Sequence, residues 1–391
     1  MNTYASTLET LYSLTRFGEK MSLDGPRKLH STLGSPLHRY DSILVGGTNG
    51  KGSTCIFLDS LLRAQGLKVG LFTSPHMNQF AERIRIDGEM LSPQTIIDLT
   101  AQVYPIVQAS GGSFFEAVWG MATVAFAQAQ VDVAIWEVGL GGRLDATNVA
   151  EPVIAGITNI GLDHTHILGQ TRDAIAREKS AIFREGSPAL TSDDGDGLKA
   201  LQTAYTRDLM VIPPLDSTYD LGLRGPHQRR NAGLAVAIAR HYGHHIDYDA
   251  LTHVSWPGRC EIIDDVLLDC AHNPAGIDAL SQVSTLANAD SIHVIFGAVE
   301  GKDVASMAAR IDAWAERVTV VTPDYPRRQC AEDVAPHFAS AHVGSTVARA
   351  LDQRDLHALT IVCGSGFLVA EARAHLLGIE YPECGLRTSA R

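Results

Sequence analysis

The 391-residue chain has few cysteines, and they are widely scattered. It has no C-x-x-C pair and no compact cysteine framework, which excludes a zinc ribbon and a disulfide scaffold. We expect reduced thiols at all six positions, which are Cys55, Cys260, Cys270, Cys330, Cys363 and Cys384.

An excess of basic charge and a long apolar run are also missing. Against 44 acidic residues there are 32 Lys and Arg, and the net charge of −12 argues against a surface that binds nucleic acid or anionic lipid. The most apolar long stretch, residues 117–131, contains glutamines and is shorter than the ~20 residues of a membrane helix. The first twenty residues mix charges into their apolar positions, unlike a signal peptide. We therefore expect a cytoplasmic protein that binds anionic ligands through local groups.

The remaining sequence is 45% hydrophobic and alternates short β-branched runs with helical patterns. This alternation is typical of an α/β fold with a doubly wound, buried parallel sheet. In the helical pattern after residue 113, apolar residues recur at helical spacing and are predicted to face the core: Phe115, Val118, Trp119, Ala122 and Phe126. The predicted strands lie at 42–47, 68–74, 131–139 and 152–161, and the predicted helices at 53–65, 94–109 and 171–183.

A second alternating region begins after Pro257-Gly258, which interrupts the pattern. We place a first domain at 1–255, a linker at 256–260 and a smaller α/β domain at 261–391. Residues 184–228 are rich in Gly, Asp and Pro and are predicted to be irregular. The second region's predicted strands lie at 261–270, 291–299, 317–323 and 359–366.

A Gly-rich segment joins the first predicted strand to a helix. Its sequence, GGTNGKGST at 46–54, provides a tight turn, a lysine, a hydroxyl and a helix N-terminus. Backbone N–H groups in such a turn bind phosphate oxygens, and Lys51 neutralises their charge. The segment departs from G-x-x-x-x-G-K-[ST], because Val45 stands at the first Gly and Gly52 follows the lysine. The alternative is a flexible turn without a ligand.

Three polar residues end predicted parallel strands or follow them directly. Ser74, Glu137 and His164 should therefore lie at one sheet edge, beside the Gly-rich segment. Ser74 and Glu137 offer the oxygen ligands that Mg²⁺ prefers, whereas the imidazole of His164 is an unusual ligand for this ion and would not be chosen on chemical grounds alone. Taken singly, the three residues also suit a helix cap, an ion-pair partner and a buried core histidine.

Ten motifs in order resemble the dihydrofolate synthase/folylpolyglutamate synthase family, ATP-dependent amide ligases related to the Mur ligases. The resemblance implies a Mur-ligase-like P-loop N-terminal domain followed by a smaller α/β domain. The motifs are GTNGKGS (47–53), TSPH (73–76), FFE (114–116), EVGLGGRLDATNV (137–149), ITNIGLDHTHILG (157–169), REKSAIF (177–183), HQRRNAGLA (227–235), WPGR (256–259), DCAHNP (269–274) and CGSGFLVAEAR (363–373).

The resemblance implies one or two Mg²⁺ ions held by Ser74, Glu137 and His164, whereas His166 is outside that set. It also implies a carbamate on Lys179, which requires a neutral amine and hence a pKa lowered by burial. Ser180 and Ala181 stand where the family usually has Ala-Gly. With Lys51, Glu137 and His164, Lys179 completes the implied catalytic set.

The resemblance further assigns nucleotide and pterin contacts. It implies that ATP binds Thr48, Asn49, Gly50, Lys51, Gly52, Ser53, Asn231, Arg259, Asp269 and His272. It implies that the pterin binds Leu23, Asp24, Phe114, Phe115, Glu116, Leu144, Asp145 and Ala146; aromatic rings beside carboxylates suit a flat heterocycle that donates hydrogen bonds.

The implied reaction transfers the γ-phosphate of ATP to a carboxylate, after which the amine of L-glutamate attacks the acyl phosphate. The acceptor is dihydropteroate or a folate, and sequence does not decide which. A Mur-type ligase with another acceptor and a P-loop ATPase remain the alternatives. The resemblance also implies a monomer.

Overall fold

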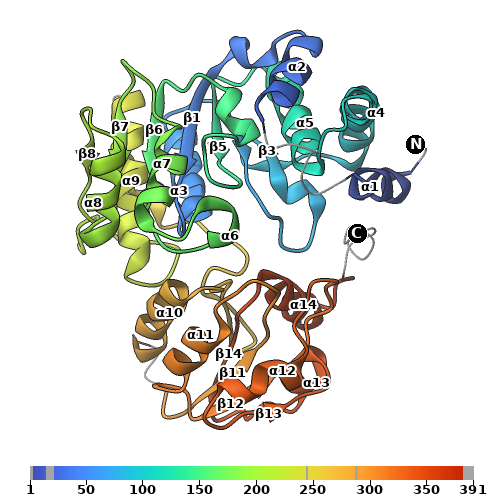
Figure 1. Cartoon of the computed structure of the whole chain (residues 1–391), viewed down its shortest axis with the longest axis vertical. Helices are drawn as coiled ribbons and strands as arrows, with labels where there is room; N and C mark the ends of the chain where they lie inside the picture. Colours follow the sequence, from blue (N-terminus) through green and yellow to red (C-terminus); the bar gives the residue numbers. More distant parts are fainter. Residues whose placement is uncertain (1–2, 15–21, 244, 287–288, 382–391) are drawn as a thin grey trace.

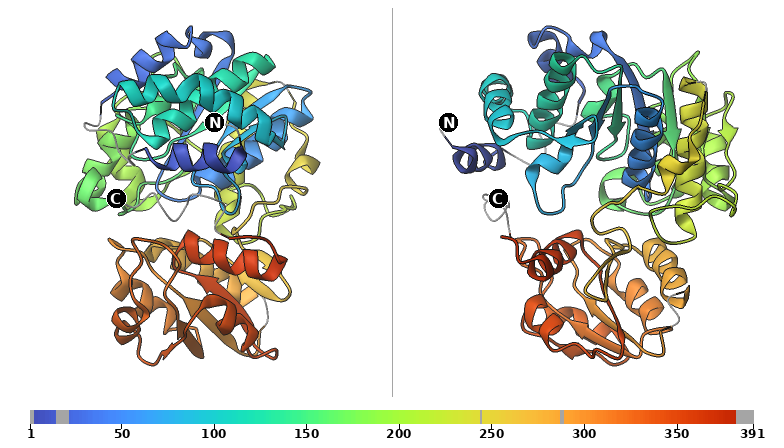
Figure 2. Two further views of the ribbon diagram at one scale, coloured as in Figure 1. Left: turned by 90° about the vertical axis from the view of Figure 1, so that its right-hand side faces the viewer. Right: turned by 180° about the vertical axis from the view of Figure 1, so that it is seen from behind.

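The computed structural model describes residues 3–14, 22–243, 245–286 and 289–381. Its strands form two separate sheets, and Figures 1 and 2 show the two sheet-based parts stacked along the long axis of the molecule. Cys384 and part of the N-terminal segment used above lie outside the described residues. Within the described residues, no helix combines the length and apolarity needed to cross a bilayer.

The first sheet has eight strands in the order β4-β3-β2-β5-β1-β6-β7-β8. The pairs from β2 to β8 are parallel, whereas β3 and β4 pair antiparallel at one edge. The strands are β1 (Asp41–Gly46), β2 (Val69–Phe72), β3 (Ile84–Ile86), β4 (Glu89–Met90), β5 (Val133–Glu137), β6 (Ile154–Ile157), β7 (Ala189–Thr191) and β8 (Met210–Val211).

Helices cover both faces of this sheet because successive strand residues point to opposite sides. In β1, Leu44 belongs to the apolar cluster that includes α4 and α5, whereas Ile43 and Val45 belong to the cluster with α3 and α9. The helices are α1 (Tyr4–Tyr12), α2 (Asp24–Thr32), α3 (Lys51–Ala64), α4 (Pro93–Ala109), α5 (Phe114–Ala129), α6 (Thr165–Leu168), α7 (Arg172–Ser180), α8 (Gly195–Ala204) and α9 (His227–Tyr242).

Helix α5 confirms most of the predicted core face. Val118, Trp119, Ala122 and Phe126 are fully buried, whereas Phe115 in the first turn is only partly buried. The ring of Phe115 lies over Gly139, where an added Cβ would come within 2.6 Å of it. The start of α5 is thereby packed against the Gly-rich segment after β5.

The second sheet has the order β13-β12-β11-β14-β10-β9, and only β9 pairs antiparallel. Helices α10, α11 and α12 pack on one face, and α13 and α14 on the other. The elements are β9 (Glu261–Ile263), β10 (Val266–Leu268), α10 (Pro274–Leu286), β11 (Ile292–Phe296), α11 (Val304–Ile311), β12 (Arg317–Val320), α12 (Ala331–Val334), β13 (His342–Val343), α13 (Val347–Asp352), β14 (Leu359–Cys363) and α14 (Gly366–Leu377).

Two sequence predictions of secondary structure were wrong. Residues 184–228 are not irregular throughout, since they contain β7, α8 and β8. Residues 261–270 are not one strand but the hairpin β9–β10, which turns at Asp264 and Asp265, both at positive φ. The segment 256–260 lies between the two sheets in sequence, so the domain boundaries proposed above remain a prediction consistent with this topology.

Candidate active site

The segment from Gly46 to Lys51 turns sharply from β1 into α3. Gly47 has φ of 138° and Gly50, the residue before the helix, has φ of 83°. A Cβ on Gly47 would lie 1.8 Å from the Thr158 hydroxyl, and one on Gly50 would lie 2.3 Å from the Asn231 side chain. Glycine is therefore required by both conformation and space, and the turn leaves the N-terminus of α3 open to an anion.

The residues after β6 hold this turn in place. Thr48 N–H donates to the Asn159 carbonyl, and Asn49 N–H donates to the Asn159 side-chain oxygen. The Thr158 hydroxyl donates to the Asn49 carbonyl over 2.6 Å. These bonds connect the turn to the residues that follow β6.

Two lysines converge on one backbone carbonyl. Lys51 Nζ donates to the carbonyls of Gly47 and Thr48 over 3.2 Å each, and Lys179 Nζ donates to Gly47 over 2.8 Å. Lys179 is buried, and burial together with the nearby charge of Lys51 lowers its pKa to about 7. Glu178 instead pairs with Arg143, so it does not neutralise Lys179. A large neutral fraction of the Lys179 amine near pH 7 is what carbamate formation needs.

The pKa of Lys179 predicts a pH-dependent stability. Between pH 7 and the ordinary value of 10.5 the unfolded chain binds more protons at Lys179 than the folded chain, so the free energy of unfolding rises with pH. From pH 7 to 9, in buffers free of CO₂, this contribution should grow by about 2 kcal/mol and be absent in Lys179→Met. Urea unfolding at both pH values measures it. Lys199→Met, an exposed lysine, should retain the slope; equal slopes in all three proteins would contradict the prediction.

Glu137, at the end of β5, adjoins the phosphate turn. Its Oε2 accepts the Ser74 N–H over 2.9 Å, and a Cβ on Gly52 would lie 3.5 Å from Oε1. Burial raises the pKa of Glu137, whereas Lys51 and the bond from Ser74 oppose the rise. Two of the three predicted metal residues are thus in contact beside the turn.

His164 follows β6 and precedes α6 at a φ of 49°. The same loop reaches the phosphate turn, because Gly161 N–H donates to the Thr48 hydroxyl over 2.9 Å. Burial lowers the pKa of His164 to about 4, so its ring is neutral. His166 is exposed.

Two of the three candidate donors, Ser74 and Glu137, suit magnesium, whereas the imidazole of His164 is an unusual ligand for this ion. In the described part of the chain, no three His, Cys, Asp or Glu side chains form a metal cluster. Glu137 offers a carboxylate, His164 a neutral imidazole, and Ser74 a hydroxyl without a hydrogen-bond partner among the described residues. A few ligands of this kind fit an ion that keeps waters and phosphate oxygens as its remaining ligands.

The segment 256–272 adds charged groups on the other side of the site. The carboxylate of Asp269 accepts the N–H groups of Cys260 and Ala271. Although desolvation opposes it, the pKa of Arg259 is raised by Cys270, Asp269 and Glu137 around it. Asn231, on α9, donates to Gln228 and borders Gly50. Arg259 is therefore a cation placed between the two sheets.

Contacts across the two sheet-based parts converge on Asp163, which the sequence did not single out. Lys302 Nζ lies 2.9 Å from Oδ1, and His272 Nε2 lies 3.3 Å from Oδ2. Asn273 donates to the same carboxylate and exchanges two bonds with the side chain of Asn49 in the phosphate turn. Although burial opposes it, the His272 and Lys302 contacts hold the pKa of Asp163 far below its usual range. Asp163 lies within a quoted motif, but its partners are more than 100 residues away in sequence.

The predicted pterin residues form two neighbouring groups. A Cβ on Gly25 would lie 3.5 Å from Glu116 Oε2, so the 23–25 segment borders the start of α5. Gly139 borders both Phe115 and Asp145. The Asp145 carboxylate accepts Leu140 N–H and the N–H and hydroxyl of Thr147, so both oxygens also hold the Gly-rich segment in shape. Leu144 is half-buried and Ala146 is buried beside it.

A buried arginine beside the first of these groups was missed from the sequence. Arg83 is 8% exposed; its Nε donates to His76 Nδ1 over 2.7 Å, and its guanidinium lies 5.2 Å from the centre of the Phe114 ring. No described carboxylate forms an ion pair with it; burial lowers its pKa, which Tyr12, Glu82 and Glu137 oppose. Burial and Arg83 hold the pKa of His76 well below its usual value, so His76 accepts this bond as a neutral ring. The TSPH motif was a signal for His76, but not for its partner seven residues later.

Comparison with known protein families identifies two domains in the chain. Residues 45–203 match the Mur ligase middle domain, and residues 258–366 match the Mur ligase glutamate ligase domain. Among solved structures, E. coli FolC in complex with DHPP and ADP covers 96% of this chain and 98% of its own, at 28% identity and a TM-score of 0.86. The structure of Mycobacterium tuberculosis folylpolyglutamate synthase, complexed with ADP and AMPPCP, covers 92% of this chain and 96% of its own, at 32% identity and a TM-score of 0.83.

Curated relatives agree with the structural neighbours. The chain spans about half the length of a probable bifunctional folylpolyglutamate synthase/dihydropteroate synthase from Haloferax volcanii, at 34% identity. It is 33% identical to a dihydrofolate synthase/folylpolyglutamate synthase from Bacillus subtilis over 85% of this chain and 88% of the relative. The E. coli protein of the same name is 33% identical to this chain over 83% of this chain and 84% of the relative. This chain therefore belongs to the dihydrofolate synthase/folylpolyglutamate synthase family.

Proposed function

We propose that the chain is an ATP-dependent ligase that joins L-glutamate to dihydropteroate, to a folate, or to both through an acyl phosphate. The observation that carries the proposal is the junction of Lys51, Gly52 and Glu137 at one sheet edge. That junction combines a phosphate-binding turn with a carboxylate suited to a metal ion.

The chain's own groups fit the two steps of this reaction. The turn at 48–53 binds the nucleotide phosphates, and Lys51 stabilises charge as the γ-phosphate moves to the acceptor. Ser74, Glu137 and His164 would hold Mg²⁺, which neutralises phosphate charge when bound. Arg259, in the segment that precedes the second sheet, faces the same region. The glutamate amine then displaces phosphate, so no covalent enzyme nucleophile is required.

The remaining assignments extend this proposal. Asn231, Asp269 and His272 contact the nucleotide, and residues 23–24, 114–116 and 144–146 contact the pterin. Lys179 carries a carbamate, supported by its burial and lowered pKa. The protein works as a monomer in the cytoplasm, with the domains divided at residues 256–260.

Arg83 is proposed to bind the acceptor's carboxylate, because its buried guanidinium lies beside the Phe114 ring with no ion-pair partner among the described residues. Arg83→Gln should lower kcat/KM for the acceptor about 10- to 100-fold while leaving the KM for ATP unchanged. Arg83→Lys, which keeps the charge, should recover part of the loss. If Arg83→Gln impaired the use of ATP as much as the use of the acceptor, or impaired neither, Arg83 would not be the residue that binds the acceptor's carboxylate.

Incubation with ATP, Mg²⁺ and labelled glutamate tests the whole proposal. Label should enter dihydropteroate or tetrahydrofolate, with one ADP formed per amide bond, and the labelled acceptor identifies the activity. ADP release without amino acid consumption would point to an ATPase. Transfer of glutamate only to an unrelated carboxylate would point to another Mur-type ligase.

A further inference from the structure

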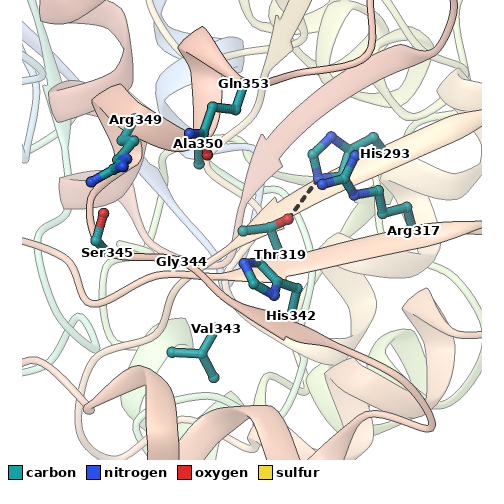
Figure 3. A pocket seen from close by; sticks show the side chains of 10 residues that line it. All are labelled: His293, Arg317, Thr319, His342, Val343, Gly344, Ser345, Arg349, Ala350 and Gln353. Atoms are coloured by element: carbon teal, nitrogen blue, oxygen red, sulfur yellow. Dashed lines mark hydrogen bonds between the residues drawn. The ribbon is translucent and has the colours of Figure 1, made fainter.

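A cavity of about 290 Å³ lies in the C-terminal part, between the second sheet and α13 (Figure 3). Its lining comes from β11, β12, β13, α13 and the segment between the last two. In Figure 1, β12, β13 and α13 lie at the end of the molecule away from the first sheet. The cavity is thus separate from the proposed active site, to which His272 contributes after the carboxyl end of β10.

Where the second sheet lines the cavity, the polar residues His293 and Thr319 occupy positions at which a buried sheet face usually has apolar residues. Val294 and Phe296 of β11 pack on the α10–α11 face, so His293 and Ile295 point to the α13–α14 face. His293 is only 2% exposed, and its Nε2 lies 2.8 Å from the Thr319 hydroxyl. Its Nδ1 is buried and has no hydrogen-bond partner among the described residues. A buried polar atom left unpaired costs stability, so a ligand atom in the cavity would offset that cost.

The walls carry positive charge. Arg317 comes from β12 and Arg349 from α13; Figure 3 shows Arg317 beside His293 and Arg349 on the opposite side of the cavity, near Ser345. Neither forms an ion pair with a described residue, and none of the ten described lining residues is acidic. This lining contrasts with the net charge of −12 of the whole chain. Burial and Arg317 lower the pKa of His293 to about 4, although Asp355 opposes the shift, so the arginines supply the charge and His293 offers a neutral ring nitrogen.

We propose that this cavity binds a phosphate group, as free orthophosphate or as part of a small phosphorylated metabolite. Guanidinium groups from two elements bind phosphate oxygens through charge-assisted hydrogen bonds. The Ser345 hydroxyl and the free nitrogen of His293 complete a polar lining for a tetrahedral anion. The volume lies at the low end for small-molecule pockets, which suits a ligand of this size.

Equilibrium dialysis of labelled orthophosphate tests the site in the full chain, with the nucleotide site saturated by Mg²⁺ and ADP. The variant Arg317→Gln/Arg349→Gln removes two exposed arginines of the cavity. Its matched control, Arg39→Gln/Arg172→Gln, removes the same charge from exposed positions elsewhere. Ser345→Glu places a negative charge in the cavity and leaves both arginines intact.

Wild type and the control should bind one phosphate that both cavity variants bind about tenfold more weakly or worse. Displacement of the label by ribose 5-phosphate would identify a phosphorylated metabolite as the ligand, and failure of displacement would identify the free ion. Unchanged isotherms in both cavity variants would overturn the proposal. Soaking crystals with tungstate gives a second test, since an anomalous peak between Arg317 and Arg349 is expected and its absence at saturating tungstate would contradict the site.

Discussion

Lys51→Ala should reduce amide formation about 10³-fold or more while leaving the fold intact. The ammonium group adjoins the phosphate turn and stabilises charge that develops during phosphoryl transfer, where single charged groups have effects of this size. Single-turnover formation of labelled product measures the loss. The unfolding midpoint shows whether the fold is retained.

The matched control for Lys51 is Lys199→Ala, which removes an exposed lysine in a surface ion pair. Such pairs contribute little, so activity and stability should both stay near wild type. Near-full synthesis by Lys51→Ala would exclude this turn as the phosphate-binding element of the reaction.

Glu137→Gln should lower activity about 100- to 1,000-fold at a fixed Mg²⁺ concentration. The substitution keeps an oxygen that can accept the Ser74 N–H but removes the negative charge beside Gly52. Weaker metal binding should also raise the Mg²⁺ concentration needed for half-maximal activity. A metal titration of the initial rate measures both effects.

Glu332→Gln provides the control for Glu137, because Glu332 is exposed on α12 and far from the first sheet in sequence. It should leave the rate and its metal dependence unchanged. If Glu137→Gln also kept the wild-type metal dependence, Glu137 would not be a metal ligand.

Much of the first domain could be predicted because its signals are local. The period-2 and period-3.6 patterns around β1, α3, β5 and α5 arise within single segments that bury one or both faces. The edge position of Ser74 and Glu137 followed from the same reasoning, since parallel strands end at one edge. The structure places these two residues in direct contact.

The missed elements lack such local signals. Helix α8 contains Gly195 and Gly197, weak helix formers, and forms where it can pack against α7. The turn between β9 and β10 uses Asp264 and Asp265 at positive φ rather than glycine. Arg83 and Asp163 become visible only through partners brought together by folding. Long-range contacts of this kind have no spacing in the sequence by which to predict them.

The position of Asp163 has a mechanical consequence. Asp163 directly precedes His164, a proposed metal ligand, and its Oδ1 accepts the His164 N–H. The same oxygen forms the ion pair with Lys302, so this ion pair lies directly beside the backbone of His164. Separating the two halves of the molecule to admit an acceptor or release a product would break this contact. The loop that carries this proposed metal ligand is therefore one of the places where the two halves of the molecule are joined.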